Sequence, residues 1–329
     1  MLPSSSSIAS RLRFRQLSLL VALDDHGSLH RAAERTGMTQ PGLTKALREI
    51  ETTFGAELFT RSPQGVHANE LGRCVVRYAR LIDADLAHLR EEIDGVLRGT
   101  GGRLAVGAIA GALHPVLVGA LGRLRAQQPA LSVEVREATS IELLTLVDEG
   151  RLDLAVCRTT VAARPERFDY EPLMDEQVAI AVGPRHPLAG AAAVTLAQLA
   201  GYRWLCYPAH MPLRHLLERE FREAGLPLPA YPSETASTFA TMLMLQEDPQ
   251  LVALMSSGTM DFCERHGIAC RLPLAIGARH EGFGIVTRRG ARPSPAAVLL
   301  AGHLRDAAAA AAQRAPDTPG APSRKIDDH

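Results

Sequence analysis

The chain has 329 residues, of which 46% are hydrophobic, and its 36 Lys and Arg residues balance its 36 Asp and Glu residues. A formal net charge of zero argues against a protein that coats nucleic acid regardless of sequence, because such binding depends on a large excess of cations. The length predicts about two or three domains with buried cores.

Residues 1–10 are predicted to be disordered, and they lack the basic and apolar segments of a signal peptide. No apolar run reaches the length that crosses a membrane. We therefore expect a cytoplasmic protein with no membrane partner.

The segment GMTQPGLTKALREIE, residues 37–51, predicts a turn followed by a helix. Thr39 is the natural N-cap, and Pro41 suits the first helical turn, where a missing amide hydrogen costs nothing. Apolar residues recur at helical spacing at Leu43, Leu47, Ile50 and Phe54.

A shorter helix precedes this one, opening at Ser28 and containing the small residues Ala32 and Ala33. A short helix, a turn and a longer helix have the spacing of a helix-turn-helix, whose second helix enters the DNA major groove. An ordinary helical hairpin is the alternative. A helix upstream and two short strands joined by the turn-forming residues 62–65 favour a winged helix-turn-helix at residues 11–68.

Residues 69–98 predict one long linker helix with an apolar stripe. The stripe consists of Leu71, Val75, Tyr78, Ile82, Leu86, Leu89, Ile93 and Leu97. Its spacing is typical of a seam between two helices and so predicts dimerisation, with packing on the chain's own body as the alternative. Glycines at 95, 99, 101 and 102 predict the end of the helix and a hinge at 99–102. They precede a strand, which excludes a phosphate-binding loop.

From residue 103 to residue 313 strands alternate with helices, and the βαβαβ pattern that opens this stretch predicts an α/β domain whose first lobe contains a parallel sheet. Lobe I is expected at about 103–171 and 277–313, and lobe II at about 172–276, so the chain crosses twice between them. This is the periplasmic-binding-protein architecture. Trp204 is predicted to be a core residue, and the tail at 314–329, rich in Pro, Asp and Ser, is predicted to be disordered.

Ligands of such sheets lie beyond the carboxyl ends of the strands, near helix N-termini. The effector-binding candidates at these places are Gly111, Thr139, Ser140, Arg158, Thr159, His210, Met211, Ser256 and Ser257. Helix capping is the alternative role for the hydroxyl groups, and a plain loop position is the alternative for His210.

Arg158 is the strongly cationic candidate at a strand end. A guanidinium there can hold a ligand carboxylate by two parallel hydrogen bonds. A structural ion pair with Glu137 or Glu142 is the alternative.

The five cysteines are widely spaced, with no C-x-x-C pair, which predicts buried, reduced thiols and no metal site. The sequence also lacks a nucleophile elbow and paired histidines at metal-binding spacing. We therefore predict no catalytic residue, no cofactor and no enzymatic activity.

Residues 12–98 resemble the DNA-binding domain and linker helix of the bacterial LysR-type transcriptional regulators. The resemblance rests on Ala32, Ala33, Thr39, Gln40, Pro41, Leu43, Thr44, Leu47, Glu51, Gly55, Leu58, Phe59 and Arg61. Asn69 departs from the threonine common in the family, and Ala110 and Gly111 stand where many members have Ser or Thr. The two-lobed part resembles the family's regulatory domain over its whole length.

The resemblance implies an N-terminal winged helix-turn-helix, a linker helix and a two-lobed domain that binds a small-molecule effector. It implies DNA contacts by Ser28, Thr39, Gln40, Pro41, Thr44, Lys45, Arg48 and Arg61. The partners implied are double-stranded promoter DNA, further copies in a homodimer or homotetramer, and RNA polymerase. Two C-terminal stretches are similar to regulators of aromatic-acid and sugar catabolism, so we expect a small carboxylate or a sugar-like effector. A cytoplasmic two-lobed solute-binding protein is the alternative function.

Overall fold

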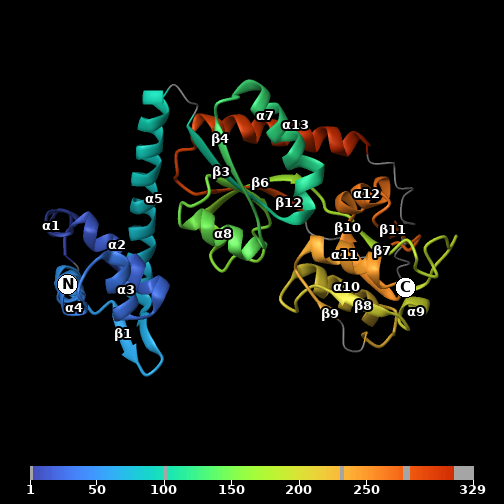
Figure 1. Ribbon diagram of the computed structural model, residues 1–329, viewed down its shortest axis with the longest axis horizontal. Coiled ribbons are helices and arrows are strands. Elements are labelled where there is room, and N and C mark those ends of the chain that lie inside the picture. Colours follow the sequence, from blue (N-terminus) through green and yellow to red (C-terminus); the bar gives the residue numbers. More distant parts are fainter. Residues whose placement is uncertain (1–2, 99–101, 230–232, 277–281, 315–329) are drawn as a thin grey trace, which may run out of the picture.

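The computed structural model describes residues 3–98, 102–229, 233–276 and 282–314 (Figure 1). The expected hinge residues 99–101, most of the second crossing at 277–281 and the tail at 315–329 lie outside this description. A helical head, a long helix and two sheet-containing lobes follow one another along the chain, as expected.

The head consists of four helices and a two-stranded hairpin. These elements are α1 (Ser5–Arg11), α2 (Phe14–His26), α3 (Leu29–Thr36), α4 (Gln40–Phe54), β1 (Phe59–Ser62) and β2 (Gly65–Ala68). The prediction of a disordered N-terminus is wrong for α1, because the Ser4 hydroxyl accepts a hydrogen bond from the amide of Ser7 and caps a helix there.

The turn between α3 and α4 depends on Gly37, whose φ of 64° lies in the left-handed region that favours glycine. Thr39 then caps α4 by accepting from the amide of Gly42 at 3.3 Å. Leu43, Leu47 and Ile50 are buried in the head core beside residues of α2 and α3. This burial fixes which face of α4 remains exposed.

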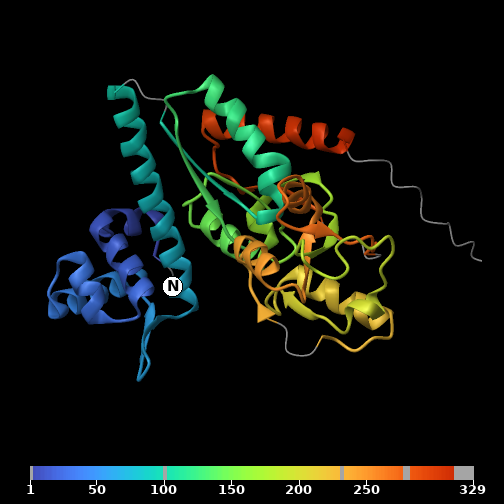
Figure 2. The same ribbon diagram turned by 45° about the vertical axis from the view of Figure 1, so that its right-hand side comes forward.

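Helix α5 (Glu70–Arg98) runs from the head towards the first lobe (Figures 1 and 2). Asn69 replaces the common threonine without loss, because its Oδ1 accepts from the amide of Gly72 at 2.8 Å. Gly95 lies inside the helix, so the expectation that this glycine helps to end it is wrong. One Gly among good helix formers is tolerated at a cost of about 1 kcal/mol.

Lobe I contains a five-stranded sheet of order β4-β3-β5-β12-β6. Its strands are β3 (Arg103–Ala108), β4 (Ser132–Glu137), β5 (Leu154–Cys157), β6 (Phe168–Met174) and β12 (Phe283–Arg288). Its helices are α6 (Ala110–Ala112), η1 (Leu113–Leu117, a π-helix), α7 (Val118–Gln127), α8 (Ser140–Asp148), η2 (Pro165–Arg167, a 3₁₀ helix) and α13 (Pro295–Arg314).

The parallel pairing predicted for the first three strands of lobe I is confirmed, but neither sheet is parallel throughout. β3 is parallel to β4 and β5, but β12 returns from lobe II and inserts antiparallel between β5 and β6. A returning strand has no crossover helix to impose the parallel direction.

Lobe II contains a sheet of order β11-β7-β10-β8-β9, in which β10 is parallel to β8 and antiparallel to β7. Its strands are β7 (Val178–Val182), β8 (Arg203–Cys206), β9 (Ser233–Glu234), β10 (Leu251–Ser256) and β11 (Cys270–Arg271). Its helices are α9 (Leu196–Leu199), α10 (Pro212–Glu223), α11 (Thr238–Glu247) and α12 (Ser257–Arg265). Trp204 is 1% exposed and meets the Phe221 ring edge-on, which confirms it as a core residue.

Cys157, Cys206 and Cys263 are buried, whereas Cys74 is exposed on α5 and Cys270 is half-buried. The prediction of buried thiols is therefore wrong for Cys74. Among the described residues, no helix has both the length and the apolar character needed to cross a membrane.

Candidate functional site

Helix α4 presents a polar face opposite its buried one. Gln40, Pro41, Lys45 and Arg48 are exposed, and Thr44 is half-buried beside them. Within the described part of the chain, neither Lys45 nor Arg48 forms an ion pair, so both cations are open to solvent. A short helix whose exposed front carries amide, hydroxyl and cationic groups can contact base edges and phosphates.

Two further DNA-contact candidates flank this helix in sequence. The Ser28 side chain makes no capping hydrogen bond to α3, although Ser28 occupies the N-cap position. Arg61 is exposed on β1 in the hairpin. Ser28 is half-buried and Arg61 is exposed, so both residues keep some surface in contact with solvent.

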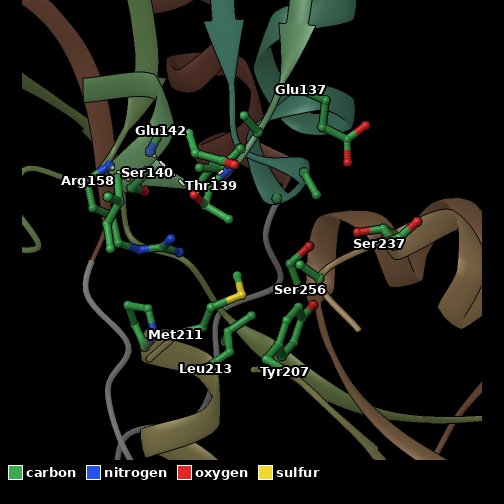
Figure 3. Close-up of a pocket in the computed structure, with 18 of the residues that line it drawn as sticks. Glu137, Thr139, Ser140, Glu142, Arg158, Tyr207, Met211, Leu213, Ser237 and Ser256 are labelled. Atoms are coloured by element: carbon green, nitrogen blue, oxygen red, sulfur yellow. Dashed lines mark hydrogen bonds between the residues drawn. The ribbon is translucent and has the colours of Figure 1, made fainter. Parts of the chain in front are cut away.

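The second candidate site is a cavity of about 410 Å³ between the two lobes (Figure 3). Lobe I contributes the segments that follow β3, β4 and β5, and lobe II contributes the segments that follow β8 and β10 and the start of α11. The candidates that line it are Gly111, Thr139, Ser140, Arg158, His210, Met211 and Ser256.

Thr159 and Ser257 do not line this cavity. The Ser257 hydroxyl instead accepts from Nη1 of Arg271 at 3.3 Å. Position after a strand therefore predicted the segments that line the cavity but not every residue within them.

The lining hydroxyl groups have structural partners. Thr139 and Glu142 form a capping box at the start of α8, in which the Thr139 hydroxyl donates to the Glu142 carboxylate at 2.9 Å. Ser256 caps α12, and its hydroxyl lies 2.8 Å from that of Thr259. Thr139 and Ser256 thus act as helix caps, the alternative role considered for them.

Arg158 forms an ion pair with Glu176, a residue that sequence reasoning missed. Arg158 is 6% exposed and Glu176 is 7% exposed, and Nη2 of the guanidinium contacts Oε2 of the carboxylate. The partners expected from sequence, Glu137 and Glu142, are wrong. Glu176 lies in the first crossing between the lobes, between β6 and β7. Its place as an acidic residue in that crossing is the sequence feature that could have pointed to it as the partner of Arg158.

Gly111 makes room for this carboxylate. A Cβ at position 111 would overlap Oε1 of Glu176 and approach Cβ of Ser256 to 3.3 Å. The departure from the Ser or Thr that many family members carry is therefore matched by a carboxylate that occupies the space.

Lobe II supplies a mixed apolar and polar wall. Figure 3 shows the Arg158 guanidinium directed into the cavity, with Met211 and Tyr207 on the lobe II side. Burial raises the pKa of Tyr207 to about 12, although the nearby charge of Arg158 opposes the shift. The phenol is therefore protonated at neutral pH, and no hydrogen bond joins it to another residue in the described ranges.

His210 lies across from helix α8. The amide of Thr139 lowers the pKa of the Glu142 carboxylate by hydrogen bonding, and the charge of His210 contributes to the same shift. His210 is exposed, so it stands at the rim of the cavity and not in its interior.

The predicted stripe of α5 is largely open in the single chain. Leu71, Tyr78, Leu86, Leu89, Ile93 and Leu97 are exposed. Val75 and Ile82 are half-buried, and Val75 packs on the head core. Packing on the chain's own domains therefore accounts for only a small part of the stripe.

Comparison with known families gives two matches that together span the head and the lobes. Residues 14–73 match the family described as "Bacterial regulatory helix-turn-helix protein, lysR family", and residues 97–309 match "LysR substrate binding domain".

Curated relatives match along most of the chain. The HTH-type transcriptional regulator GbpR of Azospirillum brasilense is 30% identical over 318 residues, which cover 96% of this chain and 93% of that protein. The HTH-type transcriptional regulator GalR of Pseudomonas putida is 29% identical over 302 residues, covering 88% and 73%.

Solved structures share the fold. CbnR, a LysR family transcriptional regulator, aligns with a TM-score of 0.62 at 17% identity and covers 90% of this chain and 99% of that one. Full-length CbnR complexed with its target DNA aligns with a TM-score of 0.59 at 18% identity, covering 90% and 100%.

Proposed function

The chain belongs to the LysR family of transcriptional regulators, and from that premise we propose that α4 reads promoter DNA while the inter-lobe cavity binds an uncharged, polyhydroxylated effector. The observation that carries the effector class is the buried ion pair between Arg158 and Glu176.

The DNA-reading part of the proposal rests on the polar face of α4. Gln40 and Lys45 reach base edges, and Thr44 and Arg48 extend the same face. Ser28 and Arg61 bind phosphates, which position the helix without reading sequence. Thr39 and Pro41 shape the first turn of the helix that enters the groove.

The assembly part rests on the open stripe of α5. Covering these side chains requires a second copy of the helix, so the protein is a homodimer or a pair of homodimers. Such an assembly presents two or more heads to repeated half-sites in cytoplasmic DNA. RNA polymerase is the proposed partner at the promoter.

The effector part follows from charge. A ligand carboxylate that enters the cavity meets Arg158, which is already paired with Glu176. The negative charge of the Glu176 carboxylate repels that of the ligand and so opposes binding. A hydroxyl group can accept from the guanidinium and donate to the carboxylate. Tyr207 offers another hydroxyl, and Met211 and Phe239 offer apolar surface for the CH faces of a sugar-like ring. Of the two classes expected from sequence, we therefore favour the sugar-like one.

Effector binding between the lobes changes their relative angle, and Arg80 provides a path to the head. This α5 residue contacts Asp24 of α2 at 2.9 Å and Glu149, which follows α8, at 3.2 Å. Lobe I, α5 and the head are thus joined by one cation. A change in the lobe angle that favours one arrangement of the heads shifts DNA binding by population.

A gel shift with genomic promoter fragments tests the proposal. We expect the wild-type protein to retain specific fragments in the presence of competitor DNA, and Gln40→Ala to discriminate less sharply among them. A wild-type protein that retains no specific fragment would leave the solute-binding alternative.

A further inference from the structure

We propose that Glu176 determines the specificity of the inter-lobe cavity by placing the chain's own carboxylate where a ligand anion would bind Arg158. The site therefore rejects carboxylates and accepts neutral hydroxyl compounds. This inference rests on the proposed function, in taking the cavity as the effector site, and deepens it by assigning the rejection of carboxylates to one residue.

Arg158 forms its ion pair within the chain, with Glu176. Arg158 follows β5 of lobe I and lines the cavity, yet its guanidinium contacts a carboxylate from the crossing segment. Both residues are more than nine-tenths buried. A buried guanidinium requires a counter-ion, and here the chain supplies it from 18 residues away in sequence.

The Glu176 carboxylate lies in a space bounded by residues of both lobes. Gly111 lies after β3, and a Cβ there would overlap Oε1 of Glu176. Ser256, at the end of β10 in lobe II, closes the same space from the other side. Segments from both lobes therefore enclose a space, here called the receptacle, that fits the Glu176 carboxylate. Any larger residue at position 111 would displace this carboxylate.

The ion pair between Arg158 and Glu176 disfavours anionic ligands. An incoming carboxylate would have to displace Glu176 from Arg158 or bind beside it, and either arrangement leaves two like charges close together in a desolvated site. A neutral polyol leaves the ion pair in place and hydrogen-bonds to both of its members. The pair thus selects against one ligand class and for another.

The pairing predicts chemical rescue, with acetate as the probe. In full-length Glu176→Ala the space of the carboxylate is emptied and Arg158 loses its ion pair with Glu176, so the variant should melt at a lower temperature than the wild type. Sodium acetate at tens of millimolar should then raise its melting temperature by about 2 °C or more above equal sodium chloride. Wild-type protein should show no acetate-specific rise.

Two controls locate the effect. Glu137→Ala removes an exposed carboxylate that lines the same cavity but does not pair with Arg158, so acetate should have no specific effect on it. The double variant Glu176→Ala/Arg158→Met should lose the rescue, because the cation that attracts acetate is gone. If Glu176→Ala does not fold, Glu176→Gln keeps the side-chain volume, and calorimetry should show acetate binding to it that the wild type lacks.

Absence of an acetate-specific effect on both Glu176→Ala and Glu176→Gln would overturn the inference. So would a rise of equal size in the wild type or in Glu137→Ala. Retention of promoter DNA by the wild type is measured separately, so failure of rescue alone refutes the role of Glu176, whereas failure of DNA retention refutes the proposed function.

Discussion

Individual side chains differ in how far sequence can assign them. Thr39 and Pro41 were assignable because a cap and a helix start depend on neighbours within a few residues. Arg158 was placed correctly at the cavity, but its partner was not, because Glu176 reaches it only through the packing of the crossing segment. Local chemistry is legible in one sequence, whereas a pairing made by tertiary packing is not.

Gln40→Ala should reduce discrimination at one operator base pair by about 1 to 3 kcal/mol, because an amide that bonds a base edge is removed. Arg61→Ala serves as the control and should weaken binding to all sequences alike, as expected of a phosphate contact. Footprinting against a set of single-base operator variants measures both. Unchanged base preferences in Gln40→Ala would show that this face does not read DNA.

Arg158→Met should destabilise the regulatory part by about 3 to 5 kcal/mol, because it removes the guanidinium that pairs with the buried Glu176 carboxylate. The double variant Arg158→Met/Glu176→Gln should recover much of that loss, since no charge then remains buried. Denaturant unfolding of the three proteins provides the comparison. An Arg158→Met protein as stable as the wild type would contradict the pairing.

His186 should make the protein less stable in mild acid. Its ring is buried, Nδ1 accepts from the amide of Leu188 at 3.1 Å, and burial lowers its pKa. The unfolded chain therefore binds a proton at His186 more readily than the folded protein does. The stability that the neutral ring contributes is fully present above its ordinary pKa of about 6.5 and is lost as pH falls below that value.

Thermal melting between about pH 7.5 and about pH 5.5 measures this dependence. His186→Asn, which retains an acceptor for the Leu188 amide, should show a smaller fall in melting temperature across that range. An equal fall in both proteins would assign the pH dependence to other groups.

Elements were predictable where their own periodicity defines them. α4 and α5 carry apolar residues at helical spacing, and both begin within one residue of the expected position. α1 was missed because its cap lies in a serine run without an apolar face, and none of its residues is buried. The antiparallel insertion of β12 was missed because strand direction is set by a long-range connection.

Leu89→Asp should dissociate the dimer, because it places a carboxylate within the exposed apolar stripe of α5. Ala87→Asp is the matched control, since it adds the same charge to an exposed position of the helix away from the stripe. Sedimentation should show monomers for the first variant and the wild-type assembly for the second. An intact assembly in Leu89→Asp would place the interface elsewhere.

At the scale of the whole molecule, the head and the lobes are connected through α5. Gly150 of lobe I lies against this helix, where an added Cβ would be 3.2 Å from side-chain atoms of Leu81 and Ala84. Arg80 adds the ion pairs that reach from Glu149 to Asp24. A single sequence predicted the order of these parts but not their contact, because the residues involved are distant along the chain.

In the proposed function, a neutral hydroxyl compound in the inter-lobe cavity controls operator binding. Footprinting of the full-length protein on a retained genomic fragment, titrated with neutral sugars and with the sugar acids that share their other hydroxyl groups, tests it most directly. We expect a neutral sugar to change the protected region or the affinity for the operator, and its acid counterpart to change neither. A response to the acids alone would contradict it.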